Sequence, residues 1–263
     1  MIRHRLVVHG ACGRMGQRVV EFVRQDPECE LVGALEGPGH PRLGEDIGTV
    51  LGVGPLGVKV SDRLPEVADA AIDFSVPAAS LALAKRCAAR RLPLVVATTG
   101  FTAEQREELD AVAHETALLV SANFSLVVNV LMKLAAVAGE ALRGKDFDVE
   151  IIERHHRHKH DSPSGTALQI AGAVKAAMAL GPLRHGREGL VGERPRDEIG
   201  IHAVRAGDNV GEHTVIFSTL GETLELVHKG TSRDSYAKGA VAAAKRIAGF
   251  GPGHYAMSDV LGL

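Results

Sequence analysis

The segment from residue 6 to residue 36 constrains the fold more than any other part of the sequence. The buried-strand pattern Leu6-Val7-Val8 runs into a glycine-rich turn at 10–16. A helix pattern follows, and then a second strand pattern at 30–35 that ends at Glu36. A strand, a glycine turn, a helix, a strand and an acid in this order are typical of the first βαβ unit of a dinucleotide-binding fold.

The glycine turn itself departs from the usual G-x-G-x-x-G. It reads Gly10-Ala11-Cys12-Gly13-Arg14-Met15-Gly16, with Cys12 where the second glycine is expected. Glycines let the backbone approach a pyrophosphate, which then lies at the helix N-terminus. Glu36 is placed to accept hydrogen bonds from the adenosine ribose, although by itself it is also compatible with an ordinary exposed carboxylate at a strand end.

Strand and helix patterns then alternate as far as residue 125, which predicts a parallel sheet. Strands are expected at 58–60, 70–75, 94–97 and 117–120, helices at 77–90 and 102–114, and a Gly/Pro-rich loop at 37–57. Ligands bind at the carboxyl ends of such strands. Two polar segments lie there, Thr98-Thr99-Gly100 and Ser121-Ala122-Asn123-Phe124-Ser125, although simple turn chemistry would also explain them.

The pattern changes after residue 125. An apolar helix at 127–142 is followed by strand patterns and one further helix, which predict a second, smaller α+β domain with a mostly antiparallel or mixed sheet. The strand patterns lie at 147–152, 201–205, 214–217 and 223–228, the helix at 164–180, a long helix at 232–248 and a loop after it. The boundary near 125 is inferred from this change alone.

The second domain contains a strongly basic segment. Six consecutive residues, 155–160, are histidine, arginine or lysine, and Pro163-Ser164-Gly165-Thr166 follows at a helix start. A strand, a basic loop and a helix N-terminus together favour a site for a small anion. A solvated surface loop and a chance metal-binding tract are the alternatives.

Composition limits the partners. The net charge is −2 and the pI about 6.7, so the chain as a whole attracts neither nucleic acid nor a membrane surface. Cys12, Cys29 and Cys87 are far apart and form no metal-binding pair, which indicates a reducing compartment. The first residues run directly into a strand without a signal-peptide pattern, and no apolar stretch has transmembrane length. We therefore expect a cytoplasmic protein.

Several of these segments together resemble one enzyme family, the 4-hydroxy-tetrahydrodipicolinate (dihydrodipicolinate) reductases. The resemblance covers nearly the whole chain. It rests on the glycine turn, Ala97-Thr98-Thr99-Gly100-Phe101, Asn123-Phe124-Ser125, Glu153-Arg154-His155-His156-Arg157-His158-Lys159, Pro163-Ser164-Gly165-Thr166-Ala167 and Val204-Arg205-Ala206-Gly207-Asp208. The histidine-rich string is specific to the family, whereas the glycine turn is not.

The resemblance implies an N-terminal Rossmann-type domain, formed by 1–125 and 236–263, and a substrate-binding and oligomerisation domain at 126–235. It implies reduction of a small cyclic imine dicarboxylate with NADH or NADPH by a homotetramer. By resemblance, His155 and Lys159 are catalytic, and His156, Gly165 and Thr166 bind the substrate carboxylates. The cofactor contacts implied in the same way are Gly10, Ala11, Cys12, Gly13, Arg14, Met15, Glu36, Ala97, Thr98, Thr99, Ser121, Ala122, Asn123 and Phe124.

The chain departs from the family pattern at two places. Ala97 stands where many members have glycine, and His160-Asp161-Ser162 replaces Val-Asp-Ala. Because no arginine follows Glu36 directly, we expect NADH to serve at least as well as NADPH. Separately, we expect no metal. Two rival functions remain: an NAD-binding sensor without catalysis, which would need no proton donor, and a dehydrogenase for a different small acid.

Overall fold

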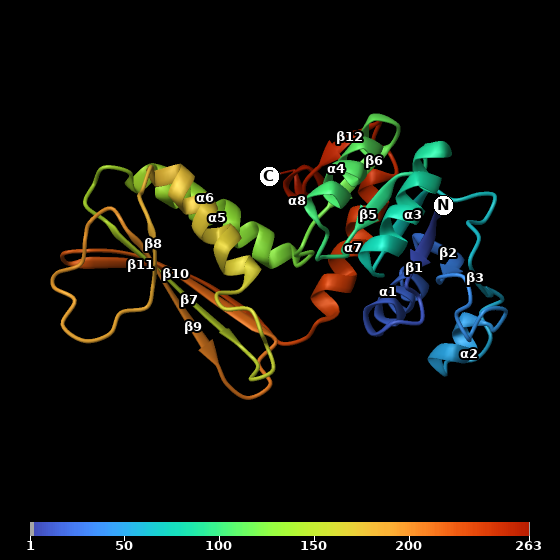
Figure 1. The fold of residues 1–263 in the computed structure, drawn as a ribbon, viewed down its shortest axis with the longest axis horizontal. Helices are drawn as coiled ribbons and strands as arrows, with labels where there is room; N and C mark the ends of the chain where they lie inside the picture. Colours follow the sequence, from blue (N-terminus) through green and yellow to red (C-terminus); the bar gives the residue numbers. More distant parts are fainter. Residues whose placement is uncertain (1–2, 263) are drawn as a thin grey trace. The chain divides into compact units, whose positions relative to one another are not determined.

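The computed structural model describes residues 3–262; residues 1, 2 and 263, which the expected first domain includes, lie outside the described part. The chain forms two compact units (Figure 1). Unit 1 comprises the chain up to Ser125 together with the segment from Asp234 onwards, and unit 2 comprises Leu126–Arg233.

Unit 1 is built on a sheet of parallel strands in the order β12-β6-β5-β4-β1-β2-β3. Its strands are β1 (His4–His9), β2 (Cys29–Leu35), β3 (Val60–Ser61), β4 (Ala70–Asp73), β5 (Leu94–Val96), β6 (Ala117–Val120) and β12 (Gly253–Tyr255). Because the described strands all run the same way, the segments that follow β1, β2, β4, β5 and β6 lie along one edge of the sheet. The expected Rossmann-type sheet is confirmed.

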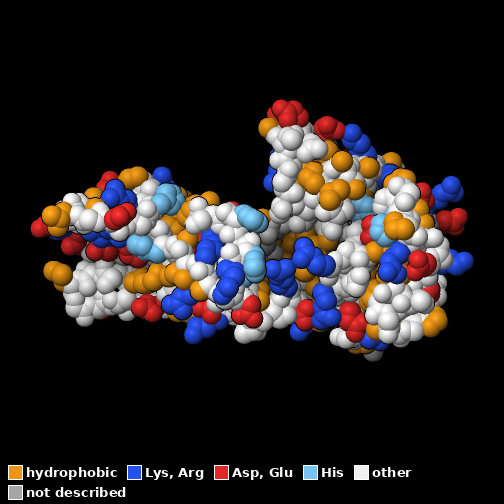
Figure 2. Space-filling view, turned by 60° about the horizontal axis from the view of Figure 1, so that its bottom comes forward, with side chains coloured by type: hydrophobic (Ala, Val, Ile, Leu, Met, Phe, Trp, Pro, Cys, Tyr) orange, Lys and Arg blue, Asp and Glu red, His pale blue; other side chains and the backbone are white. Residues whose placement is uncertain are grey.

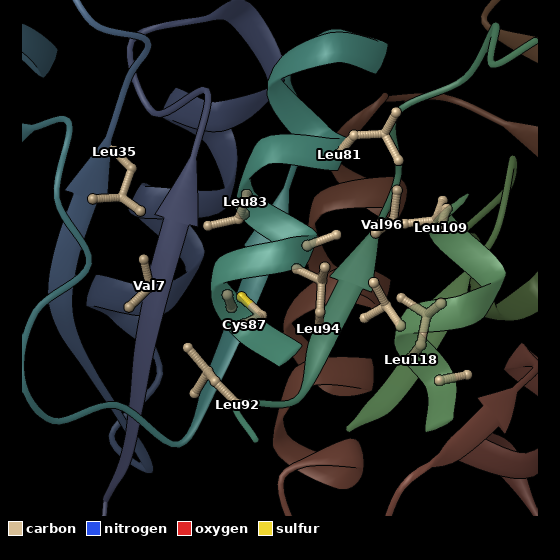
Figure 3. Close-up of a cluster of buried hydrophobic side chains, with 14 residues drawn as sticks. Val7, Leu35, Leu81, Leu83, Cys87, Leu92, Leu94, Val96, Leu109 and Leu118 are labelled. Carbon is tan, nitrogen blue, oxygen red and sulfur yellow. The ribbon is translucent and has the colours of Figure 1, made fainter. Parts of the chain in front are cut away.

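Helices cover both faces of this sheet (Figure 3). They are α1 (Arg14–Gln25), α2 (Ile47–Leu51), α3 (Pro77–Ala89), α4 (Ala103–Ala111), the 3₁₀ turn η1 (Val112–His114), α7 (Asp234–Ile247) and α8 (Met257–Leu261). Helices α3 and α4 pack with β1, β2, β4, β5 and β6 around a buried apolar cluster that includes Leu83, Leu94 and Leu109. Thr102 and Gln105 form the expected capping box at the start of α4.

Helix α7 packs against α1, β4 and β5, although it lies far from them in the sequence. Most residues of its buried face are alanine or glycine, which permits close approach. A Cβ atom at Gly239 would lie 1.7 Å from the Phe124 carbonyl oxygen. Lys245 near its end bonds to Asp26, with 2.9 Å between Nζ and Oδ2.

Three local predictions in unit 1 are wrong. The stretch 37–57 contains α2, because Asp46 accepts hydrogen bonds from the Gly48 and Thr49 N–H groups and so caps a short helix. The strand expected at 58–60 is Val60–Ser61, and Lys59 forms only an isolated bridge with Asp46. The expected loop after α7 contains β12, which extends the sheet beside β6, and α8.

Unit 2 contains a mixed sheet in the order β11-β10-β7-β9-β8, as expected. Its strands are β7 (Asp148–His155), β8 (Leu183–His185), β9 (Ile199–Arg205), β10 (Gly211–Thr219) and β11 (Glu222–Gly230), and its helices are α5 (Leu126–Leu142) and α6 (Gly165–Met178). The pairs of β10 with β7 and β11 are antiparallel, and those of β9 with β7 and β8 are parallel. Helices α5 and α6 lie side by side, and their apolar residues join those of β7, β9 and β10 in one core (Figure 1).

Candidate active site

The glycine turn of unit 1 has a shape that only glycine permits at two positions. Gly10 has φ +73°, and a Cβ there would lie 2.5 Å from the Phe74 carbonyl oxygen. A Cβ at Gly16 would lie 1.9 Å from the Gly10 carbonyl oxygen, so α1 starts directly against the turn. Within residues 3–262 no side chain caps α1 at Gly13. Its first N–H groups are therefore available to an anion, as a dinucleotide pyrophosphate requires.

Glu36 reaches back from the end of β2 to this turn. Its Oε1 accepts a hydrogen bond of 2.7 Å from the Cys12 N–H. The contact holds the carboxylate next to the turn, where the sequence placed a ribose-binding acid. The structure thus brings Glu36 together with residues 10–15.

A buried carboxylate joins the ends of three neighbouring strands. Asp73 accepts hydrogen bonds from the Ser75 and Thr98 hydroxyls, both at 2.6 Å, and its Oδ1 lies 2.7 Å from His9 Nδ1. Burial pushes the pKa of Asp73 up, but the hydrogen bonds from His9, Ser75 and Thr98 outweigh it, so its pKa lies below the usual value. The Thr98 side chain is therefore committed to the scaffold, and Thr98 can meet a cofactor only through its backbone.

The segment after β6 also shows turn chemistry. The Ser121 hydroxyl donates to the Asn123 carbonyl oxygen at 2.9 Å, and the Ser125 N–H donates to Asn123 Oδ1 at 2.8 Å. Phe124 is buried and lies against Phe74, with 6.3 Å between ring centroids. Of the remaining expected contacts on this edge, Thr99 and Ala122 are exposed and Ala97 is half-buried. The turn chemistry considered for this segment is present, and it orders the edge at which a cofactor would bind.

The basic segment of unit 2 begins inside the sheet. Strand β7 extends to His155, and only 7% of that residue is exposed. The expectation of a loop from residue 155 is therefore wrong by one residue, and the loop begins at His156. Glu153, two residues earlier on the same face, is fully buried. Its Oε2 lies 2.7 Å from His155 Nδ1.

Glu153 holds several groups besides His155. Arg205 at the end of β9 donates to both of its carboxylate oxygens at 2.7 Å, and the Ser164 N–H donates to Oε1 at 2.9 Å. Arg205 also donates to the Asp161 carbonyl oxygen at 2.8 Å. One buried carboxylate therefore fixes the His155 ring, the end of β9 and the start of α6.

These contacts set the protonation of Glu153 and His155, which we call the dyad. Burial raises the pKa of Glu153, but the hydrogen bonds from Arg205 and His155 lower it by more, so the pKa lies below its usual value. Burial lowers the pKa of His155, and the bond to Glu153 only partly opposes this. His155 is thus predominantly neutral near pH 7. Glu153 orients the ring through Nδ1, and Nε2 lies on the side of the ring away from Glu153.

The loop after His155 already carries a carboxylate in its anion site. Lys159 Nζ lies 2.8 Å from Asp161 Oδ1, and this ion pair, with a smaller contribution from the Gly165 N–H, lowers the pKa of Asp161. Ser164 caps α6, with its Oγ accepting from the Ala167 N–H at 3.1 Å. The lysine and the helix N-terminus can therefore hold a carboxylate together. The structure brings the expected residues Lys159 and Gly165 to one site.

His156 faces a second cation, Arg233. The Arg233 Nη2 atom lies 3.3 Å from His156 Nε2, and the buried His156 Nδ1 finds no hydrogen-bond partner in the described part of the chain. Burial lowers the pKa of His156, and the Arg233 charge adds to that effect. An unpaired buried donor next to an arginine suits a negatively charged oxygen from a ligand.

Two further histidines lie behind His155. The His213 ring meets the His155 ring edge-on at 5.4 Å and stacks on His228 at 5.7 Å. Burial, with His155 and His228 nearby, lowers the pKa of His213 to about 3. His213 is therefore neutral, and it fills space beside His155 without adding charge.

Comparisons with known proteins identify the family of the chain. Sequence profiles for the N-terminal and C-terminal parts of dihydrodipicolinate reductase match residues 4–124 and 127–261. The chain belongs to the dihydrodipicolinate reductase family. A 4-hydroxy-tetrahydrodipicolinate reductase of Citrifermentans bemidjiense is 44% identical over 98% of this chain and 99% of its own, and one of Methanopyrus kandleri is 46% identical over 97% and 96%.

A solved structure of the same family has the same fold. Dipicolinate-bound dihydrodipicolinate reductase from Paenisporosarcina sp. TG-14 has a TM-score of 0.77 and 25% identity, with 97% of this chain and 98% of that chain covered. In the described part of this reductase-family chain, no helix has the length and apolar character needed to cross a membrane. Reductases of this family bind a nicotinamide dinucleotide, and the glycine turn with Glu36 fits one.

Sequence reasoning assigned no role to Glu153, Arg205, Asp161 or Arg233. One signal for Glu153 was available: it is a charged residue in a strand that alternates apolar and polar residues, and burial of such a charge demands partners. Arg205, Asp161 and Arg233 come from distant segments or from the loop itself. Only the fold shows which groups they meet.

Proposed function

We propose that this chain catalyses the NAD(P)H-dependent reduction of 4-hydroxy-tetrahydrodipicolinate, via dihydrodipicolinate, to tetrahydrodipicolinate in diaminopimelate and lysine biosynthesis. The relatives named above carry this substrate in their names. The observation that carries the proposal is the site around His155: a neutral histidine oriented by a buried carboxylate, beside a lysine and a helix N-terminus that already hold a carboxylate.

The cofactor is proposed to bind at the carboxyl edge of the unit 1 sheet. Residues 10–15 would accept its pyrophosphate on the N–H groups of α1, and Glu36 would accept hydrogen bonds from the adenosine ribose. Residues 97–99 and 121–124 would meet the rest of the dinucleotide. A reduced nicotinamide supplies a hydride, and the protein contributes binding, orientation and electrostatics.

The substrate is proposed to bind in unit 2 through its carboxylates. One carboxylate would take the place of Asp161 on Lys159 and the N–H groups of Gly165 and Thr166. The other would lie against His156 and Arg233, where the buried His156 Nδ1 lacks a partner among residues 3–262. Charge-assisted hydrogen bonds of this kind are about twice as strong as neutral ones.

His155 and Lys159 are proposed to manage the proton. Hydride addition to the conjugated imine moves an electron pair toward the ring nitrogen and the α-carbon, and a proton must arrive there. Lys159 is a flexible ammonium group that can donate this proton. His155, held by Glu153, is placed to replace the proton or to stabilise the charge that develops. General acid catalysis of this kind is typically worth about 10²–10⁴-fold in rate.

The two units then have separate roles, with the dinucleotide on unit 1 and the substrate on unit 2. We further propose that unit 2 forms a homotetramer through its sheet. Buried and half-buried residues alternate along strand β10. One face of the sheet therefore lies under α5 and α6, and the other is open. Val227 on β11 and Val204 on β9 are exposed on this open face, and Figure 2 shows a stripe of hydrophobic side chains at the surface.

A cytoplasmic location is proposed as well, because the three cysteines are unpaired and a reducing compartment preserves them. A sensor that only binds the dinucleotide would not need the His155–Glu153 dyad. A dehydrogenase for another small acid would need a different second site from the one at His156. Both alternatives are tested by one assay: loss of NADH absorbance when freshly generated 4-hydroxy-tetrahydrodipicolinate is added. Binding of NADH without turnover would contradict the proposal.

A further inference from the structure

Three potential metal ligands of different chemistry meet beside the glycine turn. They are the Cys12 thiol from the turn, the Glu36 carboxylate from the end of β2 and the His40 imidazole from the following loop. One ligand atom of each lies within 4.8 Å of the other two, and all three residues are half-buried. We propose that Cys12, Glu36 and His40 bind a zinc ion, and that zinc and the dinucleotide exclude each other. The second part rests on the proposed cofactor site.

The donor set suits zinc. Zinc takes sulfur, nitrogen and oxygen ligands at about 2.0–2.3 Å in a tetrahedron, often three from protein and one from water. Those bond lengths place neighbouring ligand atoms about 3.5 Å apart. The atoms need to approach by up to about 1.3 Å, which rotation of the Cys12 and His40 side chains can supply because neither residue is fully buried.

Charge near the cluster favours a cation when the thiol releases its proton. Burial and the neighbouring Glu36 raise the pKa of Cys12 to about 11, so the thiol is protonated near neutral pH. Glu45 adds a further negative charge near Cys12, and Arg42 opposes it with a positive one. The two are also paired with each other, at 3.3 Å, which reduces the influence of both. Zinc binding then displaces one proton, so affinity rises with pH.

Zinc at this cluster would occupy the carboxylate that the ribose needs. Glu36 Oε1 accepts a hydrogen bond from the Cys12 N–H at 2.7 Å, which holds the carboxylate beside the turn. A metal on Glu36 and Cys12 would lie where a ribose hydroxyl is expected. Because linkage is reciprocal, each ligand must weaken the other by the same factor.

The direct test is a zinc titration of the metal-free protein, without NADH and with a phosphine in place of a thiol reductant. A chelating zinc indicator reports the affinity of the wild type, Cys12→Ser and His40→Ala. Loss of even an outer partner costs about 10–100-fold in metal affinity, so both variants should bind at least about tenfold more weakly. Cys29→Ser removes a buried thiol outside the cluster and should bind zinc like the wild type.

The histidine tract at 156–160 offers a competing explanation for any zinc binding. His158→Ala addresses it, because His158 is exposed and far in sequence from the glycine turn. Zinc affinity that falls in His158→Ala and stays unchanged in Cys12→Ser overturns the proposed site. Cobalt(II) gives a second readout, since a thiolate-to-metal absorption band should appear with the wild type and be missing with Cys12→Ser.

Exclusion is tested by NADH titration at increasing zinc. The apparent NADH dissociation constant should rise in proportion to zinc in the wild type and much less in His40→Ala. An NADH affinity that zinc leaves unchanged overturns the exclusion. Failure of NADH to bind the metal-free protein instead contradicts the proposed cofactor site, and the zinc titration, which contains no NADH, still decides the metal site.

Discussion

Glu153 and His155 occupy alternate positions of β7, so that both side chains point to the same face of the sheet, and Glu153 Oε2 lies 2.7 Å from His155 Nδ1. A fully buried carboxylate in contact with a histidine has an orienting role when the histidine acts on a proton. Arg205 balances the charge of Glu153 with two hydrogen bonds of 2.7 Å. The dyad is therefore held from β9 as well as from β7.

Replacing Glu153 tests the orienting role. We expect Glu153→Gln to lower kcat at least about tenfold, a smaller loss than the about 10²–10⁴-fold typical of removing the acid–base group itself. Because Glu153 supports the charged form of His155, its loss lowers the pKa of His155 further. The limb of the pH–rate profile that reports His155 should therefore move to lower pH.

Two controls separate this role from simple destabilisation. Glu212→Gln removes a carboxylate from neighbouring β10 that bonds only weakly, at 3.4 Å, to Arg154, and it should keep the native pH profile. Glu153→Gln leaves Arg205 without its charged partner, which costs about 3–5 kcal/mol for a buried pair. The kinetics are therefore measured well below the unfolding temperature of the variant. A lower kcat with an unshifted pH profile would show a structural role only.

In the proposed binding mode, Asp161 competes with the substrate for Lys159 and the start of α6. We expect Asp161→Asn to bind pyridine-2,6-dicarboxylate more tightly, since the substitution removes the charge that holds Lys159 at 2.8 Å. A partly exposed ion pair is worth about 0–1 kcal/mol, so the gain should be up to about fivefold. Calorimetric titration measures it. Weaker binding by the variant would mean that Asp161 orders the loop for the substrate.

The histidine cluster makes folding stability depend on pH. Burial lowers the pKa of folded His213 to about 3, while the unfolded residue titrates near about 6.5. The unfolded chain therefore binds a proton that the folded chain does not. This stabilisation is complete above about pH 6.5 and is lost as the pH falls toward the folded pKa. At about 1.4 kcal/mol per pH unit, the free energy of unfolding should drop by about 2 kcal/mol between pH 7 and 5.

Urea unfolding at several pH values checks this dependence. His155, His228, Glu153 and Lys159 also influence His213, so the comparison is between variants. His213→Gln should show a shallower slope between about pH 7 and 5, whereas His114→Gln, at an exposed position, should keep the native slope. An unchanged slope in His213→Gln would contradict the assignment of the effect to His213.

Much of the fold follows from local patterns, and the failures have local causes. The β1–α1–β2 unit is predictable because glycine spacing and apolar runs are local signals. Helix α2 lies in a Gly/Pro-rich stretch and depends on Asp46, which also accepts hydrogen bonds from the Leu56 and Gly57 N–H groups. Strand β12 is only Gly253–Tyr255 and forms because β6 offers an edge. Neither feature is visible in a short window of sequence.

The site divides in the same way. His155 and Lys159 stand out in the sequence by their residue types, but the burial of His155 does not, because a histidine followed by basic residues is typical of a loop. Burial becomes possible only when Glu153 and Arg205 lie on the same face of two paired strands. Arg233 follows β11 and contacts His156 from a distant part of the chain, so no local sequence pattern predicts this contact.

The charge at the end of β2 leads us to predict which cofactor is preferred. Glu36 repels a 2′-phosphate, and no arginine directly follows it. Arg42 lies near the turn but is paired with Glu45 at 3.3 Å. We expect kcat/KM with NADH to equal or exceed that with NADPH, and Arg42→Ala to lower only the NADPH value. A preference for NADPH of more than about tenfold, or about 1.4 kcal/mol, would contradict this.

We infer that the basic segment after β7 delivers the proton and binds the substrate, while the dinucleotide binds elsewhere. Three variants separate these roles. His155→Ala and Lys159→Ala should each lower kcat by about 10²-fold or more. His156→Ala should mainly raise KM, because a group that binds the ground state and transition state alike contributes to KM. His158→Ala, at an exposed position of the same segment, is the matched control and should behave like the wild type.

The most direct measurement is the kcat of Lys159→Ala together with its NADH affinity, by steady-state kinetics and fluorescence titration on the same preparation. We expect a kcat about 10²-fold or more below the wild type, with an unchanged NADH dissociation constant. A near-native kcat, or an NADH affinity that collapses with the lysine, would contradict the assignment of this segment as the proton-donating site.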